Sequence, residues 1–196
     1  MNPSERKTLV LAPFKAEARL LAGILPDCRQ ADAVTWTFAG GRLTTANAAG
    51  GAALIALLDR ELAETAGNRI ILFGSAGALT PELEIGQVLC CHTVLYDDRR
   101  LELPVSTDIQ ATTIITVAEP VTRTEERFRL FERYSASLVD MESFFFAESL
   151  QGRGLSGAVI RFVSDTAEQA FVLPFPAAVK ANIDKLRNQI LRVIIG

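Results

Sequence analysis

The sequence has few of the residues that hold disulfides or metal ions, with three cysteines and one histidine among 196 residues. An odd number of cysteines in a chain of this length does not predict a disulfide framework. Cys90 and Cys91 are adjacent, so in a strand their side chains point to opposite faces, and the paired spacing of structural zinc sites is missing around His92. We interpret this cluster as part of a core strand, with a zinc site as the weaker alternative, and expect neither a metal nor a cofactor.

The chain also lacks an excess of positive charge. It carries 20 Lys and Arg against 23 Asp and Glu, for a net charge of −3. Binding to nucleic acid needs clustered Lys and Arg that contact phosphates. The arginine-rich segment 123–133 contains three glutamates as well, which is typical of a solvated helix face. We therefore expect no nucleic-acid partner.

A long hydrophobic run is absent too. Residues 1–7 are polar and only a short apolar run follows them, so neither a signal peptide nor a membrane span is predicted and the expected location is the cytoplasm. Apolar residues make up 49% of the chain and charged residues 22%, as in an ordinary globular protein. A chain of 196 residues fits one domain, which we expect to cover residues 1–196.

Apolar runs typical of strands alternate with segments of helical spacing. The predicted strands cover residues 8–12, 34–38, 43–46, 69–73, 87–96, 112–117, 136–139 and 158–163. Predicted helices follow Pro13, Gly50 and Met141, occupy the charged segment, and close the chain at 176–195, where the stripe Val179, Ile183, Leu186, Ile190 and Val193 faces the core. The strands at 69–73 and 158–163 are apolar on both faces, as central strands are. We predict one α/β domain with three αβα layers around a mixed, largely parallel sheet.

Carboxylates follow several of these strands at the ends where α/β proteins bind ligands. Glu17 lies in the first helical turn after the first strand, and residues 140–142 and 164–165 each bring an aspartate to a strand end. The strand at 69–73 is expected to end in a glycine loop at 74–77. We therefore expect three carboxylates and this loop to meet at one edge of the sheet.

Each of these features also has an ordinary structural explanation. Glu17 suits a helix N-terminus, Asp140 an N-cap and Asp165 a turn. The glycine loop by itself indicates no more than a tight connection. We assign Phe144, Phe145 and Phe146 to the core and a dimer surface, although one ring could line a pocket. Only the convergence of several such groups favours a site.

Four segments resemble motifs of one enzyme family. Residues 73–79 read F-G-S-A-G-A-L and 85–88 read I-G-Q-V, similar to GSAGGL…GD(I/V)V. Residues 139–143, V-D-M-E-S, resemble V-E-M-E-(A/S/G), and residues 160–168, I-R-F-V-S-D-T-A-E, resemble (V)R-x-(I/V)-S-D-x-A-(D/E). Residues 11–21 are similar to the opening strand and G-A-M-x-x-E-x-x-x-L turn. The chain thus resembles methylthioadenosine/S-adenosylhomocysteine nucleosidases and related nucleoside phosphorylases, and its short segment 117–123 is similar to hopanoid-associated nucleosidases.

The resemblance implies a purine nucleoside phosphorylase-like fold and cleavage of the N-glycosidic bond of a purine nucleoside, in particular a 5′-modified adenosine. It makes Asp165 the acid that protonates purine N7, with a pKa raised by burial or by neighbouring negative charge. Glu17 would orient and deprotonate the attacking water, Glu142 would hold the ribose 2′- and 3′-hydroxyls, and Arg161 would hold the carboxylates in place. Further substrate-binding residues implied by the resemblance are Met141, Ser75, Ala76, Gly77, Phe14, Val121 and Ser164.

The nucleophile follows from a departure from the family pattern. Phosphorylases of this family hold phosphate with an arginine two residues before the Gly-Ser pair and another in an early loop, where this chain has Leu72 and the segment 13–15. Since phosphate needs such fixed cations, we expect water to be the nucleophile, while Lys15 and Arg19 keep phosphorolysis open as an alternative.

Several substrates and partners stay open. Methylthioadenosine, S-adenosylhomocysteine, an adenosyl-lipid and futalosine are the candidate nucleosides, and a non-catalytic nucleoside sensor is the rival from another class. A dinucleotide-binding dehydrogenase is less favoured because no G-x-G-x-x-G follows the first strand. The resemblance also implies a homo-oligomer, at least a dimer.

Overall fold

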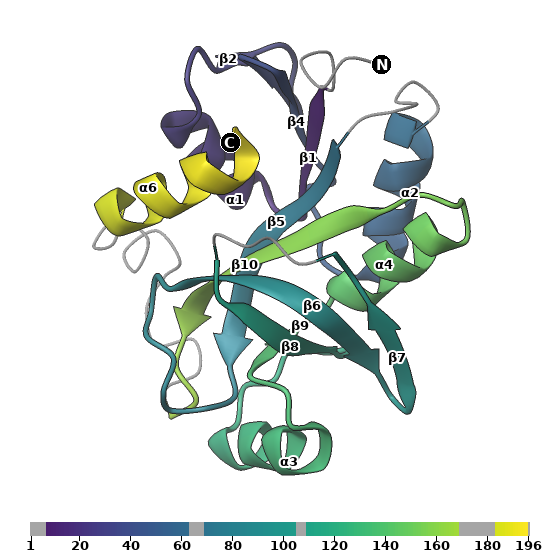
Figure 1. The fold of residues 1–196 in the computed structure, drawn as a ribbon, viewed down its shortest axis with the longest axis vertical. Helices are drawn as coiled ribbons and strands as arrows, with labels where there is room; N and C mark the ends of the chain where they lie inside the picture. The colour runs from purple at the N-terminus through teal and green to yellow at the C-terminus, as the bar shows by residue number, and fades with distance from the viewer. Residues whose placement is uncertain (1–6, 63–68, 105–108, 169–182, 196) are drawn as a thin grey trace.

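The computed structural model describes residues 7–62, 69–104, 109–168 and 183–195, which form one mixed sheet with helices on its sides (Figure 1). The strands are β1 Thr8–Ala12, β2 Arg29–Gln30, β3 Thr35–Phe38, β4 Gly41–Thr45, β5 Arg69–Ala78, β6 Val88–Tyr96, β7 Arg99–Glu102, β8 Ala111–Thr116, β9 Leu138–Asp140 and β10 Gly157–Asp165. The helices are α1 Lys15–Ile24, α2 Gly51–Leu62, α3 Thr124–Tyr134, α4 Ser143–Gln151 and α6 Ile183–Ile194. All eight predicted strands are confirmed, whereas the short strands β2 and β7 were not predicted.

The predicted hairpin between β3 and β4 is confirmed as an antiparallel pair. Its turn places Gly40 at φ 91°, in the left-handed region that favours glycine. Gly41 has no room for a side chain, because a Cβ there would lie 2.2 Å from the carbonyl oxygen of Thr8. The two glycines thus reverse the chain and let β4 lie against β1, its parallel neighbour.

The strands around β5 close into a ring. The first half of β5 pairs with β1, its last two residues pair with β9 on that side, and β10 pairs along its other edge. From β10 the ring continues through β6 and β8 back to β9. Of the ten strand pairings of the whole sheet in the part of the chain that the structure describes, five are parallel and five are antiparallel. The α/β class and the mixed sheet are confirmed, but the sheet is less parallel than predicted, and the three-layer arrangement is not confirmed because the ring is not a flat layer.

The glycine loop predicted at residues 74–77 is wrong. These residues are the second half of β5, which runs without interruption from Arg69 to Ala78. Glycine weakens a strand in general, but it also marks places where another group approaches the backbone closely. Here the approaching groups are two arginine side chains, described below.

Two core clusters lie on opposite sides of the sheet. One contains buried residues of α2 and α4, and the other contains buried residues of α1 and α6. Cys91 belongs to the first cluster and Cys90 to the second, so the prediction that adjacent cysteines of a core strand face opposite ways is confirmed. Phe144 and Phe146 are buried in the first cluster, and Phe145 packs against it. Leu186, Ile190 and Val193 of α6 are buried as predicted, whereas Val179 lies outside the described residues.

No helix in the described ranges is long and apolar enough to cross a membrane. Likewise, those ranges contain no group of three or more His, Cys, Asp and Glu side chains arranged to hold a metal ion.

Candidate active site

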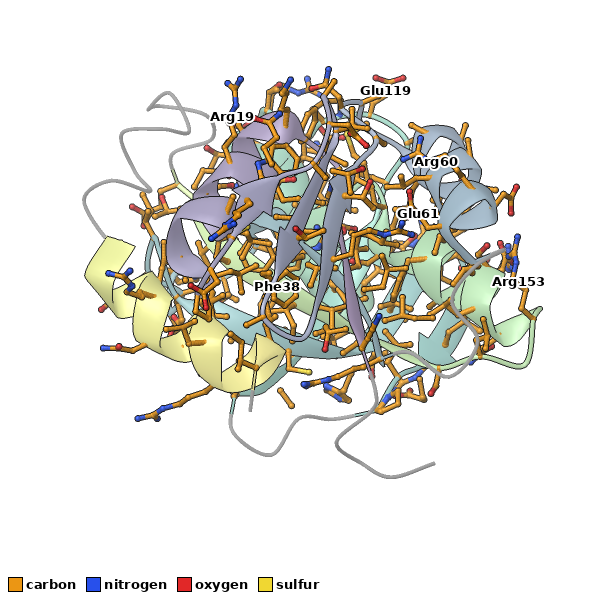
Figure 2. The ribbon with its side chains drawn as sticks, turned by 90° about the horizontal axis from the view of Figure 1, so that it is seen from above. Arg19, Phe38, Arg60, Glu61, Glu119 and Arg153 are labelled. Carbon is orange, nitrogen blue, oxygen red and sulfur yellow. The ribbon has the colours of Figure 1, made fainter. Side chains whose placement is uncertain are left out.

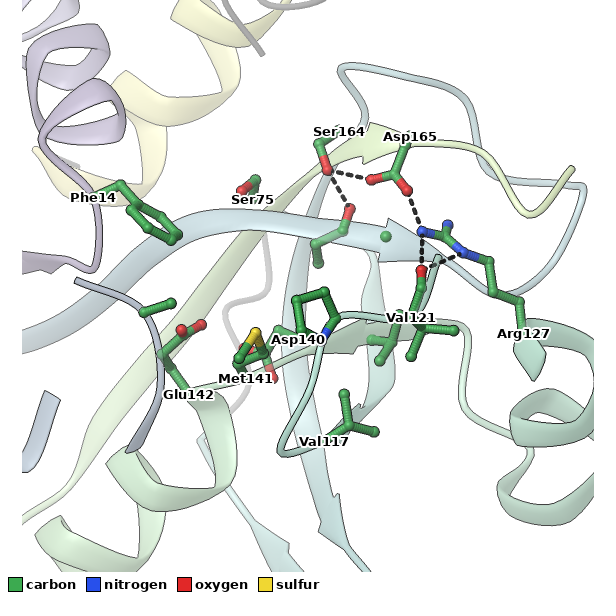
Figure 3. Close-up of a pocket in the computed structure, with 15 residues that line it drawn as sticks. Phe14, Ser75, Val117, Val121, Arg127, Asp140, Met141, Glu142, Ser164 and Asp165 are labelled. Carbon is green, nitrogen blue, oxygen red and sulfur yellow. Dashed lines mark hydrogen bonds and ion pairs between the residues drawn. The ribbon is translucent and has the colours of Figure 1, made fainter. Parts of the chain in front are cut away.

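A cavity of about 220 Å³ opens at the ends of β5, β9 and β10 (Figure 3). Nine of the eleven predicted site residues line it: Phe14, Ser75, Ala76, Gly77, Val121, Met141, Glu142, Ser164 and Asp165. The other two, Glu17 and Arg161, are buried behind this lining and contact it through hydrogen bonds and ion pairs. The expected convergence of strand ends on one edge is therefore present in the structure.

Glu17 joins the start of α1 to the middle of β5. Its Oε1 accepts hydrogen bonds from the backbone N–H and the hydroxyl of Ser75, both at 2.7 Å. Its Oε2 accepts from the backbone N–H of Phe14 at 3.0 Å, so the side chain also caps its own helix, the ordinary role considered above. Burial raises the pKa of Glu17 above its ordinary value of 4.5. The hydrogen bond from the Ser75 N–H and the charge of Arg161 lower this pKa, but burial has the larger effect.

Asp140 is the main partner of Arg161. The guanidinium Nη2 forms an ion pair with Asp140 Oδ2, and both side chains are buried. Asp140 also accepts from the Ser143 backbone N–H at 3.0 Å and from the Thr116 hydroxyl at 2.8 Å. Asp140 thus accepts a hydrogen bond from the first residue of α4, but the prediction that it is the N-cap is wrong, because Glu142 holds that position. Its carboxylate also neutralises the buried Arg161 cation, which would be costly to bury without a partner.

Glu142 lies between this ion pair and the cavity. Its Oε1 accepts a hydrogen bond from the backbone N–H of Gly50 at 2.8 Å, and its Oε2 lies 3.7 Å from Arg161 Nη2. Burial, followed by the nearby charge of Asp140, raises the pKa of Glu142 from 4.5 to about 7. Strongly shifted carboxylates of this kind cluster at functional sites.

Arg161 has one donor left over. It is 0% exposed, and its Nη1 is buried without a hydrogen-bond partner in the described part of the chain. A Cβ built on Gly74 would lie 2.3 Å from this nitrogen and 3.1 Å from Glu17 Oε1, so glycine is needed here for the two side chains to approach β5. An unsatisfied buried donor beside a buried carboxylate is a natural place for a polar ligand or water.

Asp165 lies on the other side of the cavity from Glu142 (Figure 3). Its Oδ1 accepts from the Ser164 hydroxyl at 2.6 Å, and its Oδ2 forms an ion pair with Arg127 of α3. The sequence prediction invoked burial or neighbouring negative charge, and the structure places Asp165 in a buried position but beside a cation.

The interpretation of segment 123–133 as only a solvated face is wrong at Arg127, which is 1% exposed. Arg127 shares an inward-facing helical spacing with Leu130 and Tyr134, which pack against a core cluster. The helical spacing of Arg127 with these two apolar residues was the signal in the sequence for its burial. The other charged residues of the helix led to the interpretation of the whole segment as a solvated face.

Part of the chain matches a known protein family. The model of the Phosphorylase superfamily matches residues 101–195, which confirms the family resemblance over that part of the chain. No curated protein matches.

Solved structures with the same fold include several nucleosidases. A methylthioadenosine/S-adenosylhomocysteine nucleosidase from Campylobacter jejuni is 17% identical, with a TM-score of 0.77 over 95% of this chain and 97% of its own. The enzyme of that type from Chlamydia trachomatis, bound to methylthioadenosine, is 19% identical, with a TM-score of 0.73 over 97% and 96% of the two chains. A futalosine hydrolase from Helicobacter pylori is 16% identical, with a TM-score of 0.70 over 94% of this chain and 93% of its own. At these identities the likeness shows that the chain has the fold of these enzymes.

Proposed function

We propose that this protein is a nucleosidase that hydrolyses the N-glycosidic bond of a purine nucleoside, with a 5′-modified adenosine as the preferred substrate. The observation that carries the proposal is the division of the cavity. A buried carboxylate–arginine cluster around Glu142 lies on one side and Asp165 lies on the other. Cleavage of a ribosyl C–N bond needs groups on both sides, because a cation develops on the sugar while negative charge develops on the leaving base.

In the proposed reaction, the C1′–N9 bond breaks and its electron pair leaves with the purine. Asp165 transfers a proton to N7 of the purine, and a water oxygen bonds to C1′ while its proton passes to Glu17. The products are the free base and the free sugar, and solvent exchange returns both carboxylates to their starting states.

The sugar side is suited to hold the rest of the substrate. Glu142 is at the cavity surface, where its carboxylate can accept hydrogen bonds from the 2′- and 3′-hydroxyls, and Met141 offers an apolar contact beneath the sugar. The unpartnered Arg161 Nη1 and the Oε1 of Glu17 both lie close to Gly74, which supports a water between them. Phe14 also lines the cavity on this side, whereas Ala76 and Gly77 contact Ser164 and Arg127 on the Asp165 side.

Charge supports water rather than phosphate as the nucleophile. Glu17, Asp140 and Glu142 surround a single guanidinium, so a multiply charged anion would meet excess negative charge. Neither Lys15 nor Arg19 lines the cavity, and Arg19 points outward from α1 (Figure 2).

The test is release of free base from methylthioadenosine, S-adenosylhomocysteine, adenosine, inosine and futalosine, each with and without phosphate. We expect phosphate-independent release from at least one 5′-modified adenosine. Release that requires phosphate would instead establish phosphorolysis, and nucleoside binding without release would establish a sensor.

Two variants test the roles of the carboxylates. Asp165→Asn and Glu17→Gln should each lower kcat by about 10²–10⁴-fold, as expected for positioned acids and bases. Glu119→Gln is the matched control, because Glu119 is an exposed carboxylate in the segment beside the cavity (Figure 2). An Asp165→Asn protein with full turnover would remove the acid assignment.

The location and assembly follow from the family resemblance. We propose that the protein acts in the cytoplasm as a homo-oligomer, at least a dimer, with residues 1–196 as one domain. Sedimentation of the purified chain tests the assembly.

A further inference from the structure

The hydroxyl of Ser143 lies between the two members of the buried ion pair on the sugar side. Ser143 is the first residue of α4 and is 0% exposed. Its Oγ donates to Asp140 Oδ2 at 2.6 Å and accepts from Arg161 Nε at 3.3 Å and from Arg161 Nη2 at 3.2 Å. A hydroxyl offers one donor and two acceptor positions, so all three are used in contacts with the Asp140–Arg161 pair.

These contacts fix the plane of the Arg161 guanidinium. In the part of the chain that the structure describes, Asp140 accepts a hydrogen bond from Arg161 through Nη2, and Glu142 lies 3.7 Å from the same nitrogen. Contacts to one nitrogen fix a point but leave the planar group able to turn about it. Ser143 adds a contact to Nε on the same edge. Because two nitrogens are held, the direction of the third, Nη1, is set as well.

Nη1 lies beside Glu17. It is buried without a hydrogen-bond partner in the described ranges, and a Cβ built on Gly74 would lie 2.3 Å from it and 3.1 Å from Glu17 Oε1. Under the proposed function, the oxygen of the attacking water accepts a hydrogen bond from Nη1 here while its proton passes to Glu17. A guanidinium turned away would leave Glu17 to orient the water alone. Glu142 would keep its own hydrogen bond from the Gly50 N–H and its place at the sugar.

We propose that Ser143 is a positioning residue, whose hydroxyl holds the Arg161 guanidinium so that Nη1 faces the space beside Glu17, and that turnover requires this orientation. The proposal rests on the proposed function, because it takes that space as the site of the attacking water. Ser143 is not among the residues that line the cavity, so it acts through Arg161 and not by contact with the substrate.

The first experiment compares the steady-state kinetics of wild type, Ser143→Ala and Ser143→Thr with methylthioadenosine, or with whichever of the five nucleosides is cleaved. Ser143→Ala should lower kcat by about 10–100-fold, as expected when hydrogen bonds to a charged group are lost. Its KM should stay within about threefold of wild type, because the lost contact acts in the transition state and not on the bound sugar. Ser143→Thr keeps the hydroxyl and should retain most of the wild-type kcat.

Ser149→Ala is the matched control. Ser149 lies on the same helix, and its hydroxyl also accepts a hydrogen bond from an arginine, Arg153, but at the exposed surface. This variant should keep the kcat and KM of wild type. If Ser143→Ala does not fold, Ser143→Cys carries the test, because a thiol fills the position but is only a weak hydrogen-bond acceptor.

Crystal structures of wild type and Ser143→Ala give a readout that does not depend on activity. In wild type we expect Arg161 Nη1 to face Gly74 and Glu17. In Ser143→Ala we expect the guanidinium to be turned away from them or to take more than one orientation.

The outcomes separate this proposal from the proposed function. An unchanged Arg161 orientation in Ser143→Ala, a wild-type kcat with only a lower melting temperature, or a raised KM with unchanged kcat would each overturn the role of Ser143. Wild type that releases no base from any nucleoside would overturn the hydrolysis, and the two crystal structures would still decide whether Ser143 sets the orientation of Arg161.

Discussion

Replacing Glu142 by glutamine should make the folded protein more stable above neutral pH. Glu142 is buried near Asp140, and its carboxylate form is disfavoured by burial more than the distant contact with Arg161 favours it. Glutamine has nearly the same shape, and its Oε1 can still accept the hydrogen bond from Gly50. The substitution therefore removes the unfavourable ionisation while the packing is kept.

The size of the effect follows from the pKa of Glu142, which rises from 4.5 in the ordinary state to about 7 in the fold. Below pH 4.5 Glu142 is protonated in both the folded and the unfolded chain, so its ionisation does not lower the free energy of unfolding. Between pH 4.5 and 7 only the unfolded chain ionises, and stability falls as pH rises. Above pH 7 the loss is complete and amounts to about 3 kcal/mol, at about 1.4 kcal/mol for each tenfold change in proton affinity.

The assay is urea denaturation of wild type and Glu142→Gln at intervals from pH 5 to pH 8.5. The stability difference in favour of the variant should grow by about 2–3 kcal/mol across this range and level off above pH 7. Glu125→Gln, which removes an exposed carboxylate of α3, controls for the change in net charge. A difference between Glu142→Gln and wild type that does not vary with pH would refute the reasoning.

Three further predictions concern stability, two of them in the buried polar network and one on the exposed face of α1. Gly74→Ala should lower the free energy of unfolding by about 3 kcal/mol, because its Cβ would lie 2.3 Å from Arg161 Nη1; unchanged stability in urea denaturation would show that Arg161 can move aside. Gly23→Ala should raise stability by about 0.5–1 kcal/mol, since Gly23 lies inside α1 with no atom within 4 Å of a new Cβ; a melting temperature below that of wild type would contradict this. Asp140→Asn should destabilise the protein by about 3–5 kcal/mol by leaving the Arg161 charge short of its main partner, and a loss below 1 kcal/mol in the same assay would mean that Glu142 replaces it.

Local features of the fold were predictable because they depend on neighbouring residues. Apolar runs gave the strands, helical spacing gave α1 and α2, and the position of Gly40 and Gly41 gave the hairpin. The meeting of Glu142 and Asp165 at one cavity was also predictable, because strand ends in an α/β sheet face the same edge.

Features that depend on distant partners were not predictable in the same way. Closure of the ring rests on two residues of β5, Gly77 and Ala78, pairing with Val139 and Leu138, and the hydrophobic pattern carries no information on which strands pair. The burial of Arg127 depends on Asp165, which lies 38 positions further along the chain. Residues 74–77 were predicted as a loop for a related reason. Their glycines make room for Arg161 and Arg127, which come from other elements of the chain.

Ring closure has a consequence for the order in which the protein folds. In the pairing of β5 with β10, Ile70 lies opposite Gly157, so the chain has to bring together segments that are far apart in sequence. Such non-local pairings slow folding, because the entropy of loop closure is lost before the contact forms. The residues around the cavity come from the same segments, Ser75 from β5 and Asp165 from β10. A chain that has not yet added β10 therefore lacks Asp165 at the cavity and the β10 residues of both core clusters, and recovery of activity should follow the slowest phase of refolding.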